Sequence, residues 1–160
     1  MSEQLFVPAG FAVPAGLAAA EFRLEPLGPQ HNDADYAAWT SSMDHIRATP
    51  GFAGWGWPEE MTLADNRGDL EQHAADFAAR RGFTYTVLSA GAGEVIGCVY
   101  IYPPRDGAAA GEWPAAVRSW VRADRAGLDS VLYEAVLGWL EAAWPFGSVE
   151  YAARDSGPAS

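Results

Sequence analysis

The chain has 160 residues, of which 49% are hydrophobic and 19% are charged, a composition typical of one globular domain with its own core. Its net charge of -11 excludes nucleic acid and anionic membranes as partners, because both are bound by basic patches that neutralise phosphates. One cysteine, Cys98, and three histidines exclude an internal disulfide and a Cys/His zinc site. We therefore expect no bound metal and a reducing cytoplasm as the setting.

Residues 1–20 are expected to form an arm on the surface of the domain. The motif VPAG occurs twice, at 7–10 and 13–16, and its prolines and glycines interrupt every apolar run long enough for a signal peptide or a membrane span. A frayed tail is the alternative. The domain itself is expected over residues 21–155, with a tail at 156–160.

The domain begins with a predicted strand and a predicted short helix. Residues 21–27 read as the strand, with Phe22 and Leu24 pointing inward. Asn32 or Asp33 then caps the helix.

A long aromatic loop is predicted over residues 43–61. The segment holds three glycines and two prolines, which prevent any long helix or strand. Such loops commonly bind ligands. The alternative is that Trp55 and Trp57 simply cap the core, and His45 is either a base or a structural histidine.

A second helix is predicted to start at Thr62 and to stop at Gly82. Thr62 and Asp65 resemble a capping box, and a basic last turn precedes the glycine. His73 has no metal-ligand partner at helical spacing, so it is not expected to bind metal. The buried stripe is expected to consist of Leu63, Leu70, Ala74 and Phe77.

Two strands, residues 83–88 and 95–102, are expected to follow as an antiparallel hairpin. Gly97 in the second strand would let another backbone or a ligand approach. Cys98 is expected to be a packed thiol rather than a nucleophile, because no histidine or basic residue is near it in sequence.

The segment 116–144 organises the rest of the chain. Residues 117–122 alternate with the period of a strand, and residues 128–144 have the apolar spacing of a long amphipathic helix that stops before Pro145. A last strand is predicted at 149–154. A strand that runs through a polar turn into a helix presents unpaired N–H groups, which form a natural phosphate site.

This strand, turn, glycine and helix resemble the acyl-CoA-binding core of the GNAT acyltransferase superfamily, whose signature is Q/R-x-x-G-x-G/A. One register places Asp124, Gly127 and Asp129 on the three motif positions, and another places Arg122, Arg125 and Gly127 there. The element order over residues 22–154 is also similar to the family's order. The resemblance implies an α+β fold, a three-layer α/β/α sandwich with a mixed, mostly antiparallel sheet and helices on both faces.

The resemblance also implies acetyl-CoA as co-substrate. Its pantetheine arm would bind main-chain groups of the strand, and its pyrophosphate would bind N–H groups near the glycine. The residues assigned to this site are Trp120, Val121, Arg122, Arg125, Ala126 and Gly127. Asp124 and Asp129 oppose it, because a carboxylate about 5 Å from a phosphate repels it by roughly 1 to 3 kcal/mol.

The acceptor amine is expected to contact His45, Arg47, Trp55 and Tyr85. General base and acid are not assigned. The family usually continues with a further helix that carries a tyrosine acid, whereas this chain ends after its last strand, so Tyr133 or Tyr151 would have to substitute.

Two functions are compatible with this pattern. The first is an N-acyltransferase that moves an acetyl group from acetyl-CoA to a small amine. The second is a non-catalytic GNAT-fold binding or scaffold protein that has lost acyl-CoA binding. A third reading is an unrelated α+β domain that forms a homodimer through its tryptophans.

Overall fold

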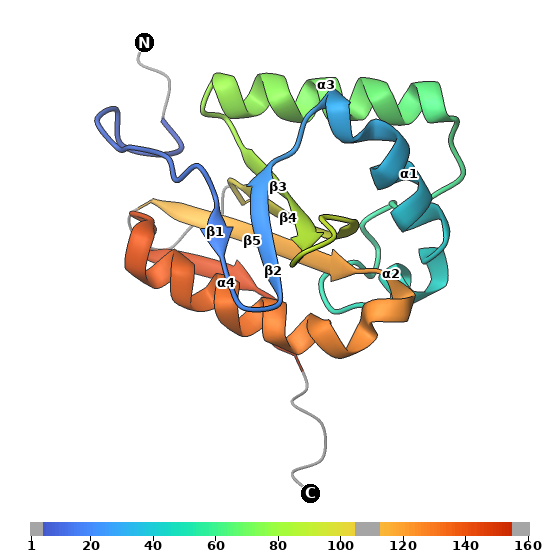
Figure 1. Cartoon of the computed structure of the whole chain (residues 1–160). Coiled ribbons are helices and arrows are strands. Elements are labelled where there is room, and N and C mark those ends of the chain that lie inside the picture. Colours follow the sequence, from blue (N-terminus) through green and yellow to red (C-terminus); the bar gives the residue numbers. More distant parts are fainter. Residues whose placement is uncertain (1–4, 105–112, 155–160) are drawn as a thin grey trace, which may run out of the picture.

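A computed structural model describes residues 5–104 and 113–154 of the chain (Figure 1). Its centre is a six-stranded sheet whose strands lie in the order in which they occur along the chain. Neighbouring strands are antiparallel except for β5 and β6, which are parallel, so the predicted mixed and mostly antiparallel sheet is confirmed. The strands are β1 Leu17–Ala18, β2 Phe22–Pro26, β3 Phe83–Ser89, β4 Val95–Tyr102, β5 Pro114–Val121 and β6 Ser148–Tyr151.

Helices cover both faces of the sheet, which confirms the predicted three layers. Figure 1 shows α3 and α4 on opposite sides of the strands, with α1 on the same side as α3. The helices are α1 Asn32–Thr40, α2 Met43–Ala48, α3 Leu63–Ala78 and α4 Asp129–Ala143, with 3-10 turns η1 Pro29–His31 and η2 Ala123–Leu128. The predicted loop therefore opens with a short helix, α2. Among the described residues, no helix is long and apolar enough to cross a membrane.

The start of α3 agrees with the predicted capping box. The Asp65 N–H donates to Thr62 Oγ1 at 3.0 Å, and the Thr62 N–H donates to the Asp65 carboxylate at 3.2 Å. The predicted buried stripe was wrong at Leu63, the first residue of the helix, which is 42% exposed. Asn66 and Leu70 are the buried residues of the helix, so a polar side chain takes part in the packed face.

Each face of the sheet has its own core. On the α4 side, alternate residues of the strands pack against Leu132, Val136, Trp139 and Leu140. On the other side, Trp39, Leu70, Tyr100 and Trp120 belong to one cluster with Cys98. Trp39, Trp120, Trp139 and Trp144, four of the seven tryptophans, are thus used in the interior of a single chain.

The described part of the N-terminal arm, residues 5–20, adds to the core on the α4 side. Val7 is buried, and the Phe6 ring stacks on Phe83 with centroids 5.8 Å apart. The hydroxyl of Tyr85 donates to the carbonyl of Pro14 at 2.6 Å. The tail predicted at 156–160 lies outside the described residues.

β5 is longer than its pairing with β6. The parallel register joins Pro114 to Ser148 and ends where Val117 faces Tyr151. The antiparallel pairing with β4 continues to Val121, because Gly97 lets the β5 backbone approach: a Cβ there would clash with the Trp120 carbonyl. The last residues of β5 therefore have a strand partner on one side only.

Candidate active site

The unpaired edge of β5 is the first element of the site. Backbone groups of alternate residues in a strand point to opposite sides, and the Arg122 N–H points to β4, where it donates to Ile96 O at 2.8 Å. The backbone groups of Ser119 and Val121 therefore point the other way, beyond the end of β6. An extended ligand would pair with this edge as an added strand.

The guanidinium of Arg154 occupies this edge. Its Nη2 donates to Ser119 O at 2.7 Å and to Ser119 Oγ at 3.2 Å, and the side chain is only 4% exposed. Its Nε donates to the Asp129 carboxylate at 2.7 Å, in the first turn of α4. Asp129, which was expected to repel a phosphate, is thus neutralised from within the chain. Sequence reasoning missed Arg154, although it is the only basic residue after Arg125.

Tyr151 lies at the same opening. Its hydroxyl is 2.6 Å from Ser119 Oγ, and its ring lies 4.6 Å from that of Tyr133, centroid to centroid. Burial raises the pKa of Tyr151, so the hydroxyl keeps its proton at neutral pH. Of the two tyrosines considered as proton donors, Tyr151 has its hydroxyl at the β5 edge.

The junction between β5 and α4 is already paired within the chain. The Arg122 guanidinium contacts both carboxylate oxygens of Asp124 at 2.9 Å, which lowers the pKa of Asp124 and raises that of Arg122. Arg125 forms a longer ion pair with Glu94, at 3.5 Å. These contacts leave the two arginines less available to a phosphate than the sequence predicted.

The other residues predicted for the donor site lie at the end of β5 and in η2. Trp120 points to the face opposite α4, where its Nε1 donates to the hydroxyl of Tyr100 at 2.9 Å. Val121 is buried on the α4 side. Ala126 and Gly127 lie in η2, where a Cβ added to Gly127 would contact nothing within 4 Å. At the start of η2, the Ala123 N–H donates to Ser42 Oγ at 2.8 Å.

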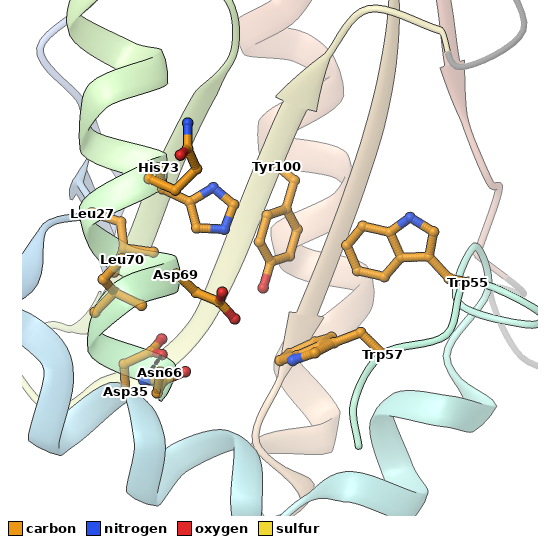
Figure 2. A pocket seen from close by; sticks show the side chains of 10 residues that line it. Leu27, Asp35, Trp55, Trp57, Asn66, Asp69, Leu70, His73 and Tyr100 are labelled. Atoms are coloured by element: carbon orange, nitrogen blue, oxygen red, sulfur yellow. Dashed lines mark hydrogen bonds between the residues drawn. The ribbon is translucent and has the colours of Figure 1, made fainter. Parts of the chain in front are cut away.

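A cavity of about 270 Å³ opens on the face opposite α4 (Figure 2). Trp55 and Trp57 form one side of it, α3 forms the other, and Tyr100 of β4 lies between them. The Trp55 ring meets Tyr100 edge-on, with centroids 5.6 Å apart. Trp55 is thus the predicted acceptor residue that lies in this cavity, and Trp57, predicted either to bind or to cap, lines it too.

Two carboxylates make the cavity acidic. Burial raises the pKa of Asp35 to about 6, although the hydrogen bond from Asn66 Nδ2, 3.2 Å long, lowers it. Burial, together with the nearby charges of Asp65 and Glu59, also raises the pKa of Asp69. In Figure 2 the Asp69 carboxylate points into the cavity toward Tyr100. An ammonium group is the ligand that these carboxylates would favour.

Two further hollows lie along the same face of the sheet, toward β6. A second hollow of about 520 Å³ shares Trp55, His73 and Tyr100 with the first and extends to Arg118 and Glu150. A third, of about 380 Å³, shares Arg118 and Glu150 with the second and reaches Tyr151. The three hollows follow one another along the face opposite α4, from α3 to β6, and are called the groove below. The Tyr151 hydroxyl, beside Ser119 Oγ, belongs to the α4 side of the sheet.

The structure does not bring the four predicted acceptor residues together. His45 and Arg47 line a separate hollow at the turn between α1 and α2, beside Ala123, and Arg47 donates to the Pro58 carbonyl from Nη2 at 2.9 Å. Tyr85 is fully buried on the α4 side of the sheet. His73, by contrast, was considered only as a metal ligand, yet it lines two hollows of the groove. Sequence spacing carried no signal for this, because its partners come from β3 and β4.

No family model and no curated protein matches this sequence. Solved structures do match its fold. RimJ of Mycobacterium smegmatis, solved with CoA-disulfide, has a TM-score of 0.60 at 16% identity, covering 86% of this chain and 64% of RimJ. The microcin C7 self-immunity acetyltransferase MccE, solved with acetyl-CoA and AMP, has a TM-score of 0.59 at 14% identity, covering 81% of this chain and 66% of MccE. A GNAT-family protein of Bordetella pertussis has a TM-score of 0.56 at 19% identity, covering 80% of this chain and 73% of that protein.

The chain has the GNAT fold. It spans about two thirds of the length of RimJ and MccE. Identities this low establish the GNAT fold alone.

Proposed function

We propose that this chain is a GNAT-type N-acetyltransferase that moves an acetyl group from acetyl-CoA to a small amine in the cytoplasm. The observation that carries the proposal is the unpaired β5 edge at Ser119 and Val121, which lies next to a groove with an acidic, aromatic end. An extended pantetheine arm fits such an edge, and an ammonium fits the carboxylates. The acetyl-CoA bound to MccE, a protein of the same fold, supports the choice of donor.

The proposed reaction joins an amine held in the groove to a thioester held at the β5 edge. The amine nitrogen attacks the thioester carbonyl, a C–N bond forms and the C–S bond breaks, and the sulfur leaves as thiolate. Tyr151, whose protonated hydroxyl lies at the β5 edge, donates a proton to that thiolate and regains one from the amide nitrogen through solvent. Holding both reactants at one strand edge supplies the proximity that the reaction needs.

Donor binding requires Arg154 to leave the edge. Its guanidinium takes the Ser119 carbonyl that the pantetheine arm would use. Removing Arg154 alone would leave Asp129 unpaired beside the donor phosphates, so the informative variant removes both charges. Asp129→Gly with Arg154→Ala keeps the net charge and opens the edge.

The test measures the Kd of acetyl-CoA by calorimetry for the wild type and for this double variant. We expect the double variant to bind at least about tenfold more tightly, because it removes an internal competitor. The control is Arg67→Ala with Glu71→Ala, which deletes an exposed ion pair on α3 and should leave the Kd unchanged. Thiol release with a panel of small amines then measures turnover. If neither wild type nor double variant binds acetyl-CoA at millimolar concentration, the acetyltransferase proposal is wrong.

The second candidate is a GNAT-fold binding protein without acyl transfer. The nearly complete burial of Arg154 at the edge favours it, since that contact satisfies the groups a donor would need. If the double variant binds acetyl-CoA and the wild type does not, the wild-type donor site is blocked by Arg154 and no longer functions. Amine binding without acetyl transfer would then be the remaining activity.

A further inference from the structure

His73 stands at the junction of the first two hollows of the groove. It comes from the packed side of α3, and Figure 2 shows its imidazole pointing into the cavity, toward Asp69 and Tyr100. Burial lowers the pKa of His73, although the charge of Asp76 raises it, so the ring is neutral at pH 7. A neutral imidazole keeps one nitrogen free to accept a proton.

Hydrogen bonds decide which nitrogen that is. The Tyr102 hydroxyl donates its single proton to the Asp76 carboxylate at 2.9 Å. Its oxygen is also 2.9 Å from His73 Nδ1, so Nδ1 must be the donor of that second hydrogen bond. Thr84 Oγ1, 3.1 Å from Nδ1, is able to accept from it too. Asp76 and Tyr102 therefore hold His73 as the Nδ1–H tautomer.

The lone pair is then on Nε2. Within residues 5–104 and 113–154, Nε2 makes no hydrogen bond, and it is not among the buried polar atoms that lack a partner, so it is open to the groove. The charged and titratable groups that line the two hollows with the ring are Asp69 and Asp76 of α3, Asp35 of α1, Tyr100 and Tyr102 of β4, Arg118 of β5 and Glu150 of β6. In this environment Nε2 is the neutral proton acceptor.

We infer that His73 is the general base of the acetyl transfer and that Tyr102 and Asp76 are its positioning residues. This inference rests on the proposed function. The bound ammonium gives one proton to Nε2, the freed lone pair forms the C–N bond, and the thiolate leaves. The second N–H proton leaves through solvent, which offsets the proton that Tyr151 gives to the sulfur, and His73 then returns its own proton to water.

The spacing of the elements is compatible with this path. Tyr100, against which His73 packs with ring centroids 5.7 Å apart, pairs with Arg118 of β5. The open edge is on the far side of β5, so about two strand spacings, roughly 10 Å, separate base and thioester. The amine therefore has to bind in the second hollow, between His73 and the edge, with its proton passing to Nε2 through a water molecule.

The first experiment determines the tautomer by 15N NMR of the imidazoles in the free protein. We expect neutral His73 with its proton on Nδ1 and a pKa below 6.5, both altered by Tyr102→Phe. Neutral His73 with its proton on Nε2 would overturn the inference, whatever the fate of the proposed function.

The second experiment follows acetyl transfer at saturating acetyl-CoA. His73→Gln should lower kcat by about 10² to 10⁴ and remove the acidic limb of the pH profile, with the KM for acetyl-CoA unchanged. Tyr102→Phe should lower kcat less and shift that limb. The control is Arg67→Ala, which removes an exposed side chain of the same helix, ion-paired with Glu71 and outside the groove.

The two proposals fail in distinguishable ways. An active wild type together with a His73→Gln variant within twofold of its kcat overturns this inference and leaves the acetyltransferase proposal intact. No transfer by the wild type or by the opened Asp129 and Arg154 variant removes both.

Discussion

Asp35 keeps a carboxyl group inside the molecule without an ion pair among the described residues, and the nearby charge of His31 offsets only part of the effect of burial on its pKa. Its side chain belongs to α1, the residue is 4% exposed, and Asn66 is its hydrogen-bond donor. Burial of a charged carboxylate without a cation costs stability, which is the reason for its raised pKa. Such a cost is tolerated where a ligand supplies the missing charge, and this agrees with an ammonium in the cavity.

Because burial of the Asp35 carboxylate lowers stability, a neutral side chain of the same size at this position should stabilise the protein. The pKa of Asp35 is about 6 in the folded protein and 3.8 in the unfolded chain. The favourable contribution of this carboxyl group to the free energy of unfolding is therefore fully present below pH 3.8 and is lost as the pH rises through 6. At pH 7.5 we expect Asp35→Asn to raise the free energy of unfolding by about 1 to 3 kcal/mol, with a smaller gain at pH 5. Urea unfolding at both pH values measures this. Asp33→Asn, on the exposed side of α1, is the control and should not stabilise. A loss of stability in Asp35→Asn would contradict the argument.

At the scale of a single element, α4 is the part of the fold that its sequence determines most directly. The apolar positions recur with helical spacing, and the helix ends at Ala143, two residues before Pro145. Leu132 is 0% exposed, whereas Val131, its neighbour in sequence, is 41% exposed. The two side chains project about 100° apart around the helix, so Val131 falls outside the buried face, although the apolar spacing of the sequence predicts it there.

This contrast gives a matched pair of variants. Leu132→Ala should lower the free energy of unfolding by about 2 to 5 kcal/mol, because it leaves a cavity against the sheet. Val131→Ala should change it by less than about 0.5 kcal/mol, since exposed positions tolerate truncation. Urea midpoints of the two variants provide the measurement. Equal midpoints would show that the helix face is assigned wrongly.

The elements that local pattern specifies were predictable, and those that depend on distant partners were not. The β3–β4 hairpin and α4 follow from periods of two and 3.6 residues in the sequence. The face of α3 did not follow, because Asn66 is buried through hydrogen bonds to Asn32, Asp35 and Trp39. The sequence pattern of α3 alone does not predict these partners, because all three belong to α1.

The site shows the same division. The strand-to-helix junction was found from its pattern, whereas Arg154 and His73 were not. Arg154 reaches Ser119, 35 residues away, and His73 reaches Tyr102, 29 residues away. Pairings over such separations are set by the three-dimensional fold and are invisible in one sequence.

At the scale of the whole molecule, the N-terminal arm closes the core on the α4 side. Phe6 stacks on Phe83 and Phe146, and the Arg80 side chain donates to the Pro8 carbonyl at 2.7 Å. Burial of apolar side chains at about 25 cal/mol per Å² makes this contact a substantial part of the stability of a domain this size. The arm is therefore expected to unfold together with the sheet.

Truncation of the buried arm side chains tests this expectation. Val7→Ala should lower the free energy of unfolding by about 1 to 3 kcal/mol, because Val7 is fully enclosed. Leu5→Ala is the matched control, since Leu5 is 53% exposed. Thermal unfolding followed by near-UV circular dichroism measures both. An unchanged melting temperature in Val7→Ala would mean that the arm detaches before the domain unfolds.

The contact of Arg154 with the β5 edge makes the affinity for any ligand at that edge a property of an internal equilibrium. The guanidinium is tethered only a few residues beyond β6, so its effective concentration does not fall when the protein is diluted. The observed Kd equals the intrinsic Kd divided by the fraction of molecules with the edge open, so an edge open in about 1% of molecules binds about a hundredfold more weakly. Any interaction that holds the Arg154 side chain away from the β5 edge would reverse this hundredfold loss of affinity without contacting the ligand.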